Sequence, residues 1–201
     1  LLRSYKIKDR KKIAIELLKF CKIKRLKLLI SSDVKMAKEI NADGVHLPEY
    51  MIYNQSKINW KKYGVDIVLE CTGKYNSKEK CIQHIKNGAK KVIVSAPCKN
   101  ADKTIVYGVN HKTINKNDLI ISAASCTTNC LAPVAFIINK EFKIEKGFMT
   151  TIHSYTTDQR LLDNSHKDPR RARSAGQSIV PTSTGASKTL EEIIPELKGK
   201  I

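Results

Sequence analysis

The 201-residue sequence lacks a long apolar run. No stretch approaches the roughly 18 consecutive apolar residues of a membrane-spanning helix, so we expect no membrane partner. A signal peptide is not expected either, because the first six residues soon become polar and charged. They include no initiating methionine, and we expect the chain to be a fragment.

Regularly spaced cysteines are also lacking, although the chain contains 6 cysteines. A disulfide scaffold or a structural zinc site would show close, repeated spacing such as Cys-x-x-Cys. We therefore expect free thiols in a reducing compartment, which indicates a cytoplasmic protein. The hydrophobic content of 41% is ordinary for a globular chain and sufficient for a core.

Aromatic residues are scarce, at 6%, and are not interleaved with the basic residues. The formal net charge is +18 and the isoelectric point is about 9.7, a balance that allows nucleic-acid binding as one hypothesis. Lysines are scattered along the whole chain without a long basic run, and no motif of a common nucleic-acid-binding fold occurs. We favour a basic surface with no nucleic-acid partner.

Arginine is rare beside lysine, and one stretch holds four arginines: Arg160, Arg170, Arg171 and Arg173. A guanidinium binds phosphate or carboxylate through two parallel hydrogen bonds, so the cluster indicates an anion site. The alternative is a solvated loop with internal ion pairs, since Asp158, Asp163 and Asp168 lie nearby.

The pattern around Cys126 predicts a strand that turns into a helix. Residues 119–121 are apolar and strand-like, and residues 131–139 are apolar at helical spacing. At the start of a helix the unpaired backbone N–H groups and the helix dipole favour negative charge. The thiol of Cys126 should therefore ionise readily, and the thiolate is the reactive form.

A thiolate nucleophile needs a base, and His153 is the candidate. It lies in residues 149–156, whose alternating, β-branched pattern predicts a strand. A cysteine with a distant histidine is the usual form of such a pair. Two alternatives are a buried, apolar Cys126 and a zinc site of Cys126, Cys130 and His153, for which no fourth ligand occurs at the usual spacing. We expect no metal, and we expect Cys130 to be a core residue.

Residues 9–47 predict alternating helices and strands. Asp9 should cap a helix with an apolar face of four residues: Ile13, Leu17, Phe20 and Cys21. A strand over 26–30, a short helix capped by Asp33 and a strand over 44–47 should follow. This order is typical of parallel β/α units.

Residues 65–95 predict the later units of a doubly wound nucleotide-binding sheet. Strands over 65–70 and 91–95 flank a helix that begins at Ser77 and ends near Asn87. The Gly-x-Gly-x-x-Gly fingerprint that opens such a domain does not occur in the sequence. A polar seam over residues 50–58 separates this part from the first.

Two stretches resemble the glyceraldehyde-3-phosphate dehydrogenase family. They are Ala-Ser-Cys-Thr-Thr-Asn-Cys-Leu-Ala-Pro at residues 124–133 and Thr-Ile-His-Ser-Tyr-Thr at residues 151–156. The likeness continues in four further stretches: residues 65–73, 90–97, 166–173 and 181–188. It covers about residues 57–201 and is incomplete at both ends.

This resemblance implies oxidation of glyceraldehyde 3-phosphate with NAD and inorganic phosphate, through a thioester on Cys126 and with His153 as the base. It implies that five residues bind substrate: Ser125, Thr127, Thr156, Thr184 and Gly185. It implies that three residues bind the cofactor: Thr72, Gly73 and Ser95. It also implies a homotetramer, the state of the intact family.

Residues 28–33 and 41–49 are similar to part of the thiamine-phosphate synthase family, whose fold is a β/α barrel. We therefore expect an α/β chain in three parts: a β/α-barrel-like fragment over 1–52, a partial NAD-binding domain over 57–125, and the start of an α+β catalytic domain over 126–201. Two functions stay open. One is the phosphorylating dehydrogenase, and the other is an inactive fusion of the two gene fragments.

Overall fold

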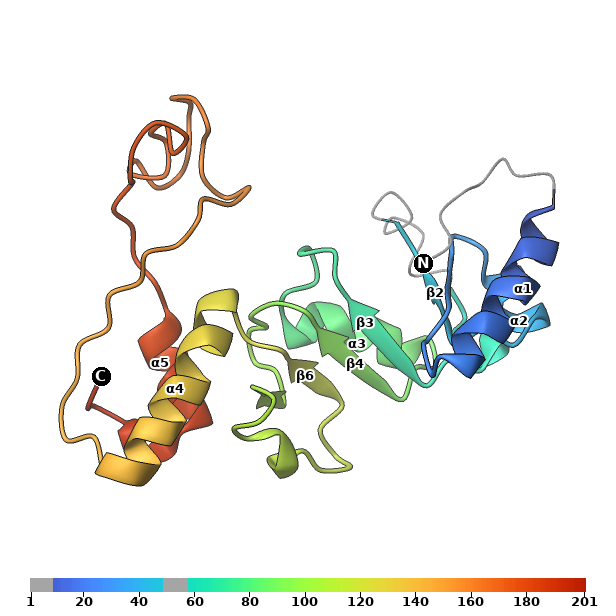
Figure 1. Ribbon diagram of the computed structural model, residues 1–201, viewed down its shortest axis with the longest axis horizontal. Coiled ribbons are helices and arrows are strands. Elements are labelled where there is room, and N and C mark those ends of the chain that lie inside the picture. The colour runs from blue at the N-terminus through green and yellow to red at the C-terminus, as the bar shows by residue number, and fades with distance from the viewer. Residues whose placement is uncertain (1–8, 49–57) are drawn as a thin grey trace. The chain divides into compact units, whose positions relative to one another are not determined.

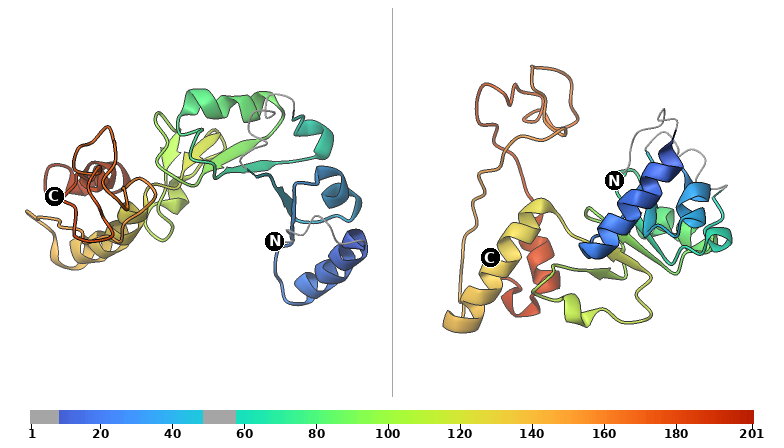
Figure 2. Two further views of the ribbon diagram at one scale, coloured as in Figure 1. Left: turned by 90° about the horizontal axis from the view of Figure 1, so that it is seen from above. Right: turned by 45° about the vertical axis from the view of Figure 1, so that its right-hand side comes forward.

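The computed structural model describes residues 9–48 and 58–201. The fold is mixed α/β with parallel sheets (Figures 1 and 2). The chain forms two compact units. Unit 1 comprises Leu1–Lys103 and Asn115–Ala123, and unit 2 comprises Thr104–Ile114 and Ala124–Ile201. The seam expected over residues 50–58 lies, except for Ile58, outside the described residues.

Unit 1 begins with α1 (Arg10–Ile23) and a small parallel sheet of β1 (Leu29–Ser31) and β2 (Gly44–His46). The connecting helix α2 (Val34–Glu39) starts at Asp33, whose carboxylate accepts a hydrogen bond of 2.8 Å from the backbone N–H of Met36. The predicted strand–helix–strand unit and its cap are thus confirmed. The assignment of residues 1–52 to a β/α-barrel-like fragment remains a prediction.

The predicted apolar face of α1 is confirmed only in part. Cys21 packs against the core and Ile13 is half-buried, but Leu17 and Phe20 are exposed, and the structure buries Ala14 and Leu18 against the small sheet instead. The helix carries apolar residues on more than one side, so the 3.6-residue period fits two faces about equally well. Packing against β1 and α2 selects the face with the small Ala14.

The second sheet has the strand order β3–β4–β6–β5, and β3 with β4 and β4 with β6 are parallel. The strands are β3 (Ile67–Glu70), β4 (Lys91–Val94), β5 (Lys103–Thr104) and β6 (Ile120–Ser122). Helix α3 (Lys78–Lys86) connects β3 to β4 and is capped by Ser77 and Asn87, as predicted. Because the strands are parallel, the carboxyl ends of β3 and β4 meet at one edge, where such sheets bind ligands.

Unit 2 packs two helices together, α4 (Cys126–Phe142) and α5 (Ala186–Ile193). The short 3-10 helices η3 (His111–Thr113) and η4 (Pro195–Leu197) complete it, while a third, η2 (Lys61–Tyr63), precedes β3 in unit 1. The core of unit 2 consists of small and aliphatic side chains: Val106, Ala124, Ala132, Ala135, Leu190, Ile193, Ile194 and Leu197.

Residues 143–185, which connect α4 to α5, form neither helix nor strand. They run from the C-terminal end of α4 to beyond its N-terminal end, form a loop there, and return to α5 (Figure 1). The predicted strand over 149–156 is therefore wrong. A strand is stabilised by pairing with a neighbour, and no strand of the described residues pairs with this segment.

The turn after α3 depends on Gly88, and this gives a stability prediction. Gly88 has φ +100, and a Cβ there would lie 2.6 Å from Cβ and 2.8 Å from the backbone N of Lys61. Gly64 also has a positive φ, +65, but nothing lies within 4 Å of a Cβ placed on it. We expect Gly88→Ala to lower the free energy of unfolding by about 2–5 kcal/mol and Gly64→Ala by only about 1–2 kcal/mol.

Urea unfolding followed by far-ultraviolet circular dichroism measures both variants. Equal losses of stability at the two glycines would contradict the steric role given to Lys61.

Candidate active site

Cys126 is the first residue of α4, directly after the turn from β6, as the sequence predicts. Ser125 is the N-cap, and its Oγ accepts a hydrogen bond of 3.1 Å from the backbone N–H of Thr128. The preceding Ala124 is buried and has φ +59, a left-handed conformation that is strained for a residue with a Cβ. This turn lets the helix begin with the thiol at its N-terminus.

His153 lies beside that thiol. Its Nε2 is 3.2 Å from Sγ of Cys126, and its Nδ1 is 2.6 Å from the carbonyl oxygen of Ser154. A carbonyl oxygen only accepts, so Nδ1 carries a proton and donates it to Ser154. In neutral His153 the lone pair of Nε2 therefore faces the thiol. This is the tautomer that a base for Cys126 requires.

The segment between α4 and His153 is long enough to bring His153 back to Cys126. Helix α4 has 17 residues, so it carries the chain about 25 Å away from Cys126 at 1.5 Å per residue. The extended residues from Lys143 to His153 can span about 35 Å, since each covers roughly 3.3 Å. The segment can thus return along the full helix to the thiol.

The two side chains shift each other's ionisation. The hydrogen bond with His153 is the largest cause that lowers the pKa of the Cys126 thiol, and the backbone N–H and hydroxyl of Thr127 lower it further against the effect of partial burial. The Ser154 carbonyl and then Cys126 raise the pKa of His153. Both shifts favour a thiolate beside an imidazolium.

Cys130 is exposed, so its prediction as a core residue is wrong. It follows Cys126 by four residues on α4, but the face of this helix that packs into the core is lined by Ala132 and Ala135. The pair Cys126 and His153 is exposed as well, which leaves the thiol open to a substrate.

The predicted substrate residues all lie in unit 2, and two of them are at helix starts. Ser125 uses its hydroxyl as the cap of α4, and Thr184 Oγ1 accepts from the N–H of Ala186, 3.3 Å away, at the start of α5. Gly185 is the N-cap of α5 and faces open space.

Thr127 hydrogen-bonds to Cys126, and Thr156 is exposed, with its backbone N–H bonded to the side chain of Gln159. The hydrogen bonds described for Thr156 and Thr184 lead to Gln159 and Ala186 and not to the thiol. Substrate binding by the five residues therefore remains a prediction.

The predicted cofactor residues lie at the carboxyl edge of the sheet in unit 1. Thr72 and Gly73 follow β3, and Ser95 follows β4. Gly73 has φ +75 with open space at its Cβ position, and Ser95 is exposed. An open turn at this edge fits close approach of a dinucleotide to the backbone. These three residues could hold part of NAD, which supplies a hydride acceptor.

The sequence indicates Glu70 only as the end of a strand, whereas the structure buries its carboxylate beside Thr72 of the predicted cofactor turn. Its carboxylate accepts a hydrogen bond of 2.8 Å from the backbone N–H of Thr72 and a second one from the Thr72 hydroxyl. The sequence does contain a sign of this environment, because Glu70 is an ionisable residue at an inward position of the otherwise apolar strand β3.

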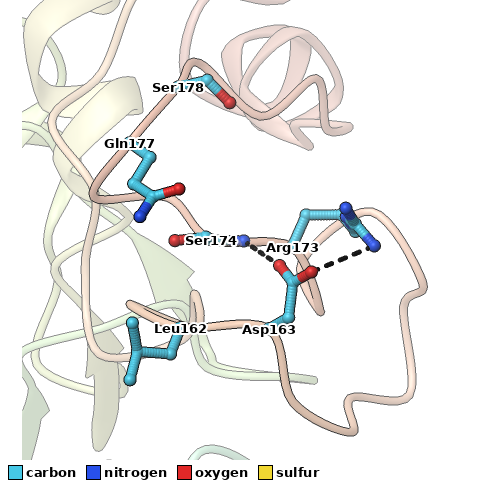
Figure 3. A pocket seen from close by; sticks show the side chains of 6 residues that line it. All are labelled: Leu162, Asp163, Arg173, Ser174, Gln177 and Ser178. Atoms are coloured by element: carbon cyan, nitrogen blue, oxygen red, sulfur yellow. Dashed lines mark hydrogen bonds and ion pairs between the residues drawn. The ribbon is translucent and has the colours of Figure 1, made fainter.

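The arginine stretch forms internal ion pairs, as the alternative interpretation expected. Arg171 bonds to Asp158 at 3.0 Å, and Arg173 bonds to Asp163 at 3.1 Å. A pocket of about 280 Å³ opens beside this second pair (Figure 3). Six residues line it: Leu162, Asp163, Arg173, Ser174, Gln177 and Ser178. Neither Cys126 nor His153 is among them, so this pocket is not the site of the thiol.

Residues 9–48 and 58–201 contain neither a membrane-spanning helix nor a cluster of metal ligands. None of the helices there combines the length and apolar character needed to cross a membrane. In the same residues, no three side chains among His, Cys, Asp and Glu come together as a metal site.

We predict that iodoacetamide alkylates Cys126 at least about tenfold faster than Cys71 or Cys130 at pH 7, because a lowered pKa increases the thiolate fraction. Cys71 and Cys130 are matched controls, since both are exposed as Cys126 is. Peptide mass spectrometry of time points measures the three rates. Equal rates in the folded protein would contradict the helix-terminus argument.

We predict that His153→Asn moves the pH midpoint of Cys126 alkylation upward, toward the roughly 8.5 of an ordinary thiol. The sign follows from the wild type, in which the bond to His153 lowers the pKa of Cys126. Alkylation at pH 5–9 measures the midpoint, and His166→Asn serves as control, because His166 bonds elsewhere, to Asp168. An unchanged midpoint in His153→Asn would show that the pair is not coupled.

Comparisons with known proteins find similarity to one enzyme family. Residues 125–201 match the family model for glyceraldehyde 3-phosphate dehydrogenase, C-terminal domain. The chain is 57% identical over 150 residues to a glyceraldehyde-3-phosphate dehydrogenase of Cereibacter sphaeroides, a match that covers 75% of this chain and 44% of the relative.

A second such enzyme, glyceraldehyde-3-phosphate dehydrogenase 2 of Bacillus subtilis, is 56% identical over 146 residues, with 72% of this chain and 43% of the relative covered. The glyceraldehyde-3-phosphate dehydrogenase of Pseudomonas aeruginosa is 50% identical over 165 residues, and the match covers 82% of this chain and 49% of the relative. The chain thus spans less than half the length of these curated relatives. The likeness of residues 1–52 to thiamine-phosphate synthase is not shown by these matches and stays a prediction. The family model and the three relatives together support glyceraldehyde-3-phosphate dehydrogenase as the family that this chain resembles, with residues 125–201 corresponding to its C-terminal domain.

Proposed function

We propose that this chain carries the catalytic cysteine and histidine of a phosphorylating glyceraldehyde-3-phosphate dehydrogenase of glycolysis, which oxidises glyceraldehyde 3-phosphate with NAD and inorganic phosphate. The observation that carries the proposal is the 3.2 Å approach of His153 Nε2 to Cys126 Sγ at the N-terminus of α4. The similarity to enzymes of that name supports the choice of substrate.

In the first step Cys126 attacks the aldehyde carbon of the substrate. The C–S bond forms, the carbonyl π electrons move to oxygen, and a hemithioacetal results. His153 acts at this stage through Nε2, which withdraws the thiol proton, leaves the thiolate, and returns the proton to the substrate oxygen as the hemithioacetal forms. Backbone N–H groups at the start of α4 stabilise the negative charge on sulfur and then on the substrate oxygen.

In the second step the hemithioacetal loses its hydroxyl proton to Nε2 of His153, and its carbon becomes a thioester. NAD, when bound, supplies the acceptor for the hydride. Thr72, Gly73 and Ser95 would hold part of this cofactor at the carboxyl edge of the sheet in unit 1, where the turn at Gly73 is open.

In the third step inorganic phosphate attacks the thioester. The C–S bond breaks, the thiolate of Cys126 leaves, and the product is the acyl phosphate 1,3-bisphosphoglycerate. Protonated His153 stabilises the departing thiolate, since its Nε2–H points at the sulfur.

Phosphate groups need donors, and the helix starts of unit 2 provide them. Thr127 lies in the first turn of α4, and Thr184 and Gly185 lie at the start of α5. Helix N-termini bind anions through unpaired N–H groups and the dipole. We assign the substrate and inorganic phosphates to these residues together with Ser125 and Thr156, and we infer a cytoplasmic homotetramer from the family.

The test is the rate of NADH formation at 340 nm with glyceraldehyde 3-phosphate, NAD and phosphate. We predict that Cys126→Ser lowers kcat at least about 10³-fold, as loss of a covalent nucleophile does, whereas Cys130→Ser leaves it within about twofold. Wild-type protein that forms no NADH, although its Cys126 is alkylated rapidly, would contradict the proposal and favour the inactive fusion.

A further inference from the structure

A chain of buried polar side chains leads through unit 1 to the predicted cofactor turn. It contains Trp60, His84 and Glu70, which are only 4%, 1% and 3% exposed. Nε1 of Trp60 is 3.3 Å from Nδ1 of His84, and Nε2 of His84 is 3.2 Å from Oε2 of Glu70. The other carboxylate oxygen, Oε1, binds the backbone N–H and the hydroxyl of Thr72. None of the three buried residues has a role in the mechanism above.

The direction of every hydrogen bond in this chain follows from Trp60. An indole N–H only donates, so Nδ1 of His84 accepts and carries no proton. Neutral His84 must then carry its proton on Nε2 and donate it to Glu70. Glu70 is therefore an acceptor for three donors: His84 Nε2–H, Thr72 N–H and the Thr72 hydroxyl.

Burial by itself would raise the pKa of Glu70, but the hydrogen bonds from His84 and Thr72 outweigh it and place the pKa below that of an ordinary glutamate. The residue is thus a buried carboxylate with partners on both oxygens. The burial of Glu70 is the reverse of what its strand would be expected to show, because β3 buries this charged residue and leaves the apolar Leu69 62% exposed. A strand that served only the core would place an aliphatic side chain at the inward position.

The consequence for Thr72 is a hydroxyl of fixed polarity. Its proton is directed at Glu70, and one lone pair of Oγ1 accepts from the backbone N–H of Lys74, 3.2 Å away. Oγ1 retains one lone pair and no free proton. It can accept a hydrogen bond from a ligand hydroxyl, but it cannot donate one to a phosphate oxygen.

We propose that Glu70, held by His84 and Trp60, is a positioning residue that fixes the Thr72–Gly73 turn and makes the Thr72 hydroxyl a dedicated acceptor for a ribose hydroxyl of the cofactor. This inference rests on the proposed function, in which the turn binds NAD. It adds the chemical group that the turn recognises and the buried residues that determine the recognition.

Glu70→Gln tests the inference by replacing one carboxylate with an amide of the same shape. The oxygen of the new side-chain amide must face the Nε2–H of His84, because Trp60 still occupies Nδ1. The amide NH₂ then faces Thr72, so the Thr72 hydroxyl becomes an acceptor within the protein and turns its proton outward, while the backbone N–H of Thr72 loses its acceptor. The substitution keeps size and shape and reverses the polarity that the turn presents to a ligand.

We expect the Kd for NAD of the full chain, measured by isothermal titration calorimetry, to rise about tenfold in Glu70→Gln, the effect of losing one well-placed hydrogen bond. Glu79→Gln is the matched control, since it makes the same change at an exposed position on α3, and its Kd should stay within about twofold. In turnover assays the loss should appear in KM for NAD with kcat nearly unchanged. Equal Kd values for wild type and a folded Glu70→Gln would overturn the inference.

Thr72→Val provides the same test if Glu70→Gln does not fold. It should weaken NAD binding about as much, and Thr72→Ser should restore it. NAD analogues that each lack one ribose hydroxyl then identify the donor: with the correct analogue, wild type and Thr72→Val should bind equally. Retention of the full difference with every analogue would overturn the assignment of a ribose hydroxyl.

The imidazole nitrogens of His84 give a readout that needs no cofactor. Nitrogen-15 NMR should show a protonated Nε2 and an unprotonated Nδ1 at pH 7. The opposite tautomer would overturn the inference even if NAD binds. Wild-type protein that shows the expected tautomer but binds no NAD would instead overturn the proposed function, and with it the ligand named for Thr72.

Discussion

The start of helix α4 is the feature on which the candidate active site depends. The cap by Ser125 and the left-handed turn at Ala124 let the helix begin at Cys126. A thiol at this position is close to unpaired N–H groups, which stabilise its charged form. If the helix began a turn later, the thiol would lie in the connecting segment and lose both the N–H groups and the dipole.

The second requirement is the irregular segment between α4 and α5. It provides no strand pairing and little core, and its order comes from local contacts such as the ion pairs of Arg171 and Arg173 with aspartates. Exposed ion pairs of this kind each stabilise by only about 0–1 kcal/mol. His153 is therefore held by a part of unit 2 that is weakly stabilised on its own, while its partner Cys126 belongs to a packed helix. The hydrogen bond from Nδ1 to Ser154 fixes the ring locally and compensates in part for this difference.

Two histidines of this chain illustrate how environment assigns a role. His153 is exposed, donates from Nδ1 to a carbonyl oxygen, and presents Nε2 to a thiol. His84 is buried, accepts at Nδ1 from an indole, and presents its Nε2–H to a carboxylate. The neighbours thus select opposite tautomers, one suited to accepting a proton and the other to holding a carboxylate in place. Neither role follows from the residue type.

Much of the local structure was determined by the sequence alone. Short-range signals placed the caps at Asp33 and Ser77, the strands β3, β4 and β6, and the change from strand to helix at Cys126, because caps and periodicity act within a few residues. The candidate nucleophile Cys126 and the candidate base His153 were also visible in the sequence. Their 3.2 Å approach was not, since a 17-residue helix and an irregular return separate them.

Tertiary structure alone decided the buried face of α1, the exposure of Cys130, the absence of the predicted strand over 149–156, and the network of Trp60, His84 and Glu70. In each case the deciding partner lies far away in the sequence. Packing selects one of several apolar faces, strand pairing requires a neighbour, and a buried carboxylate is tolerated only where distant donors meet it.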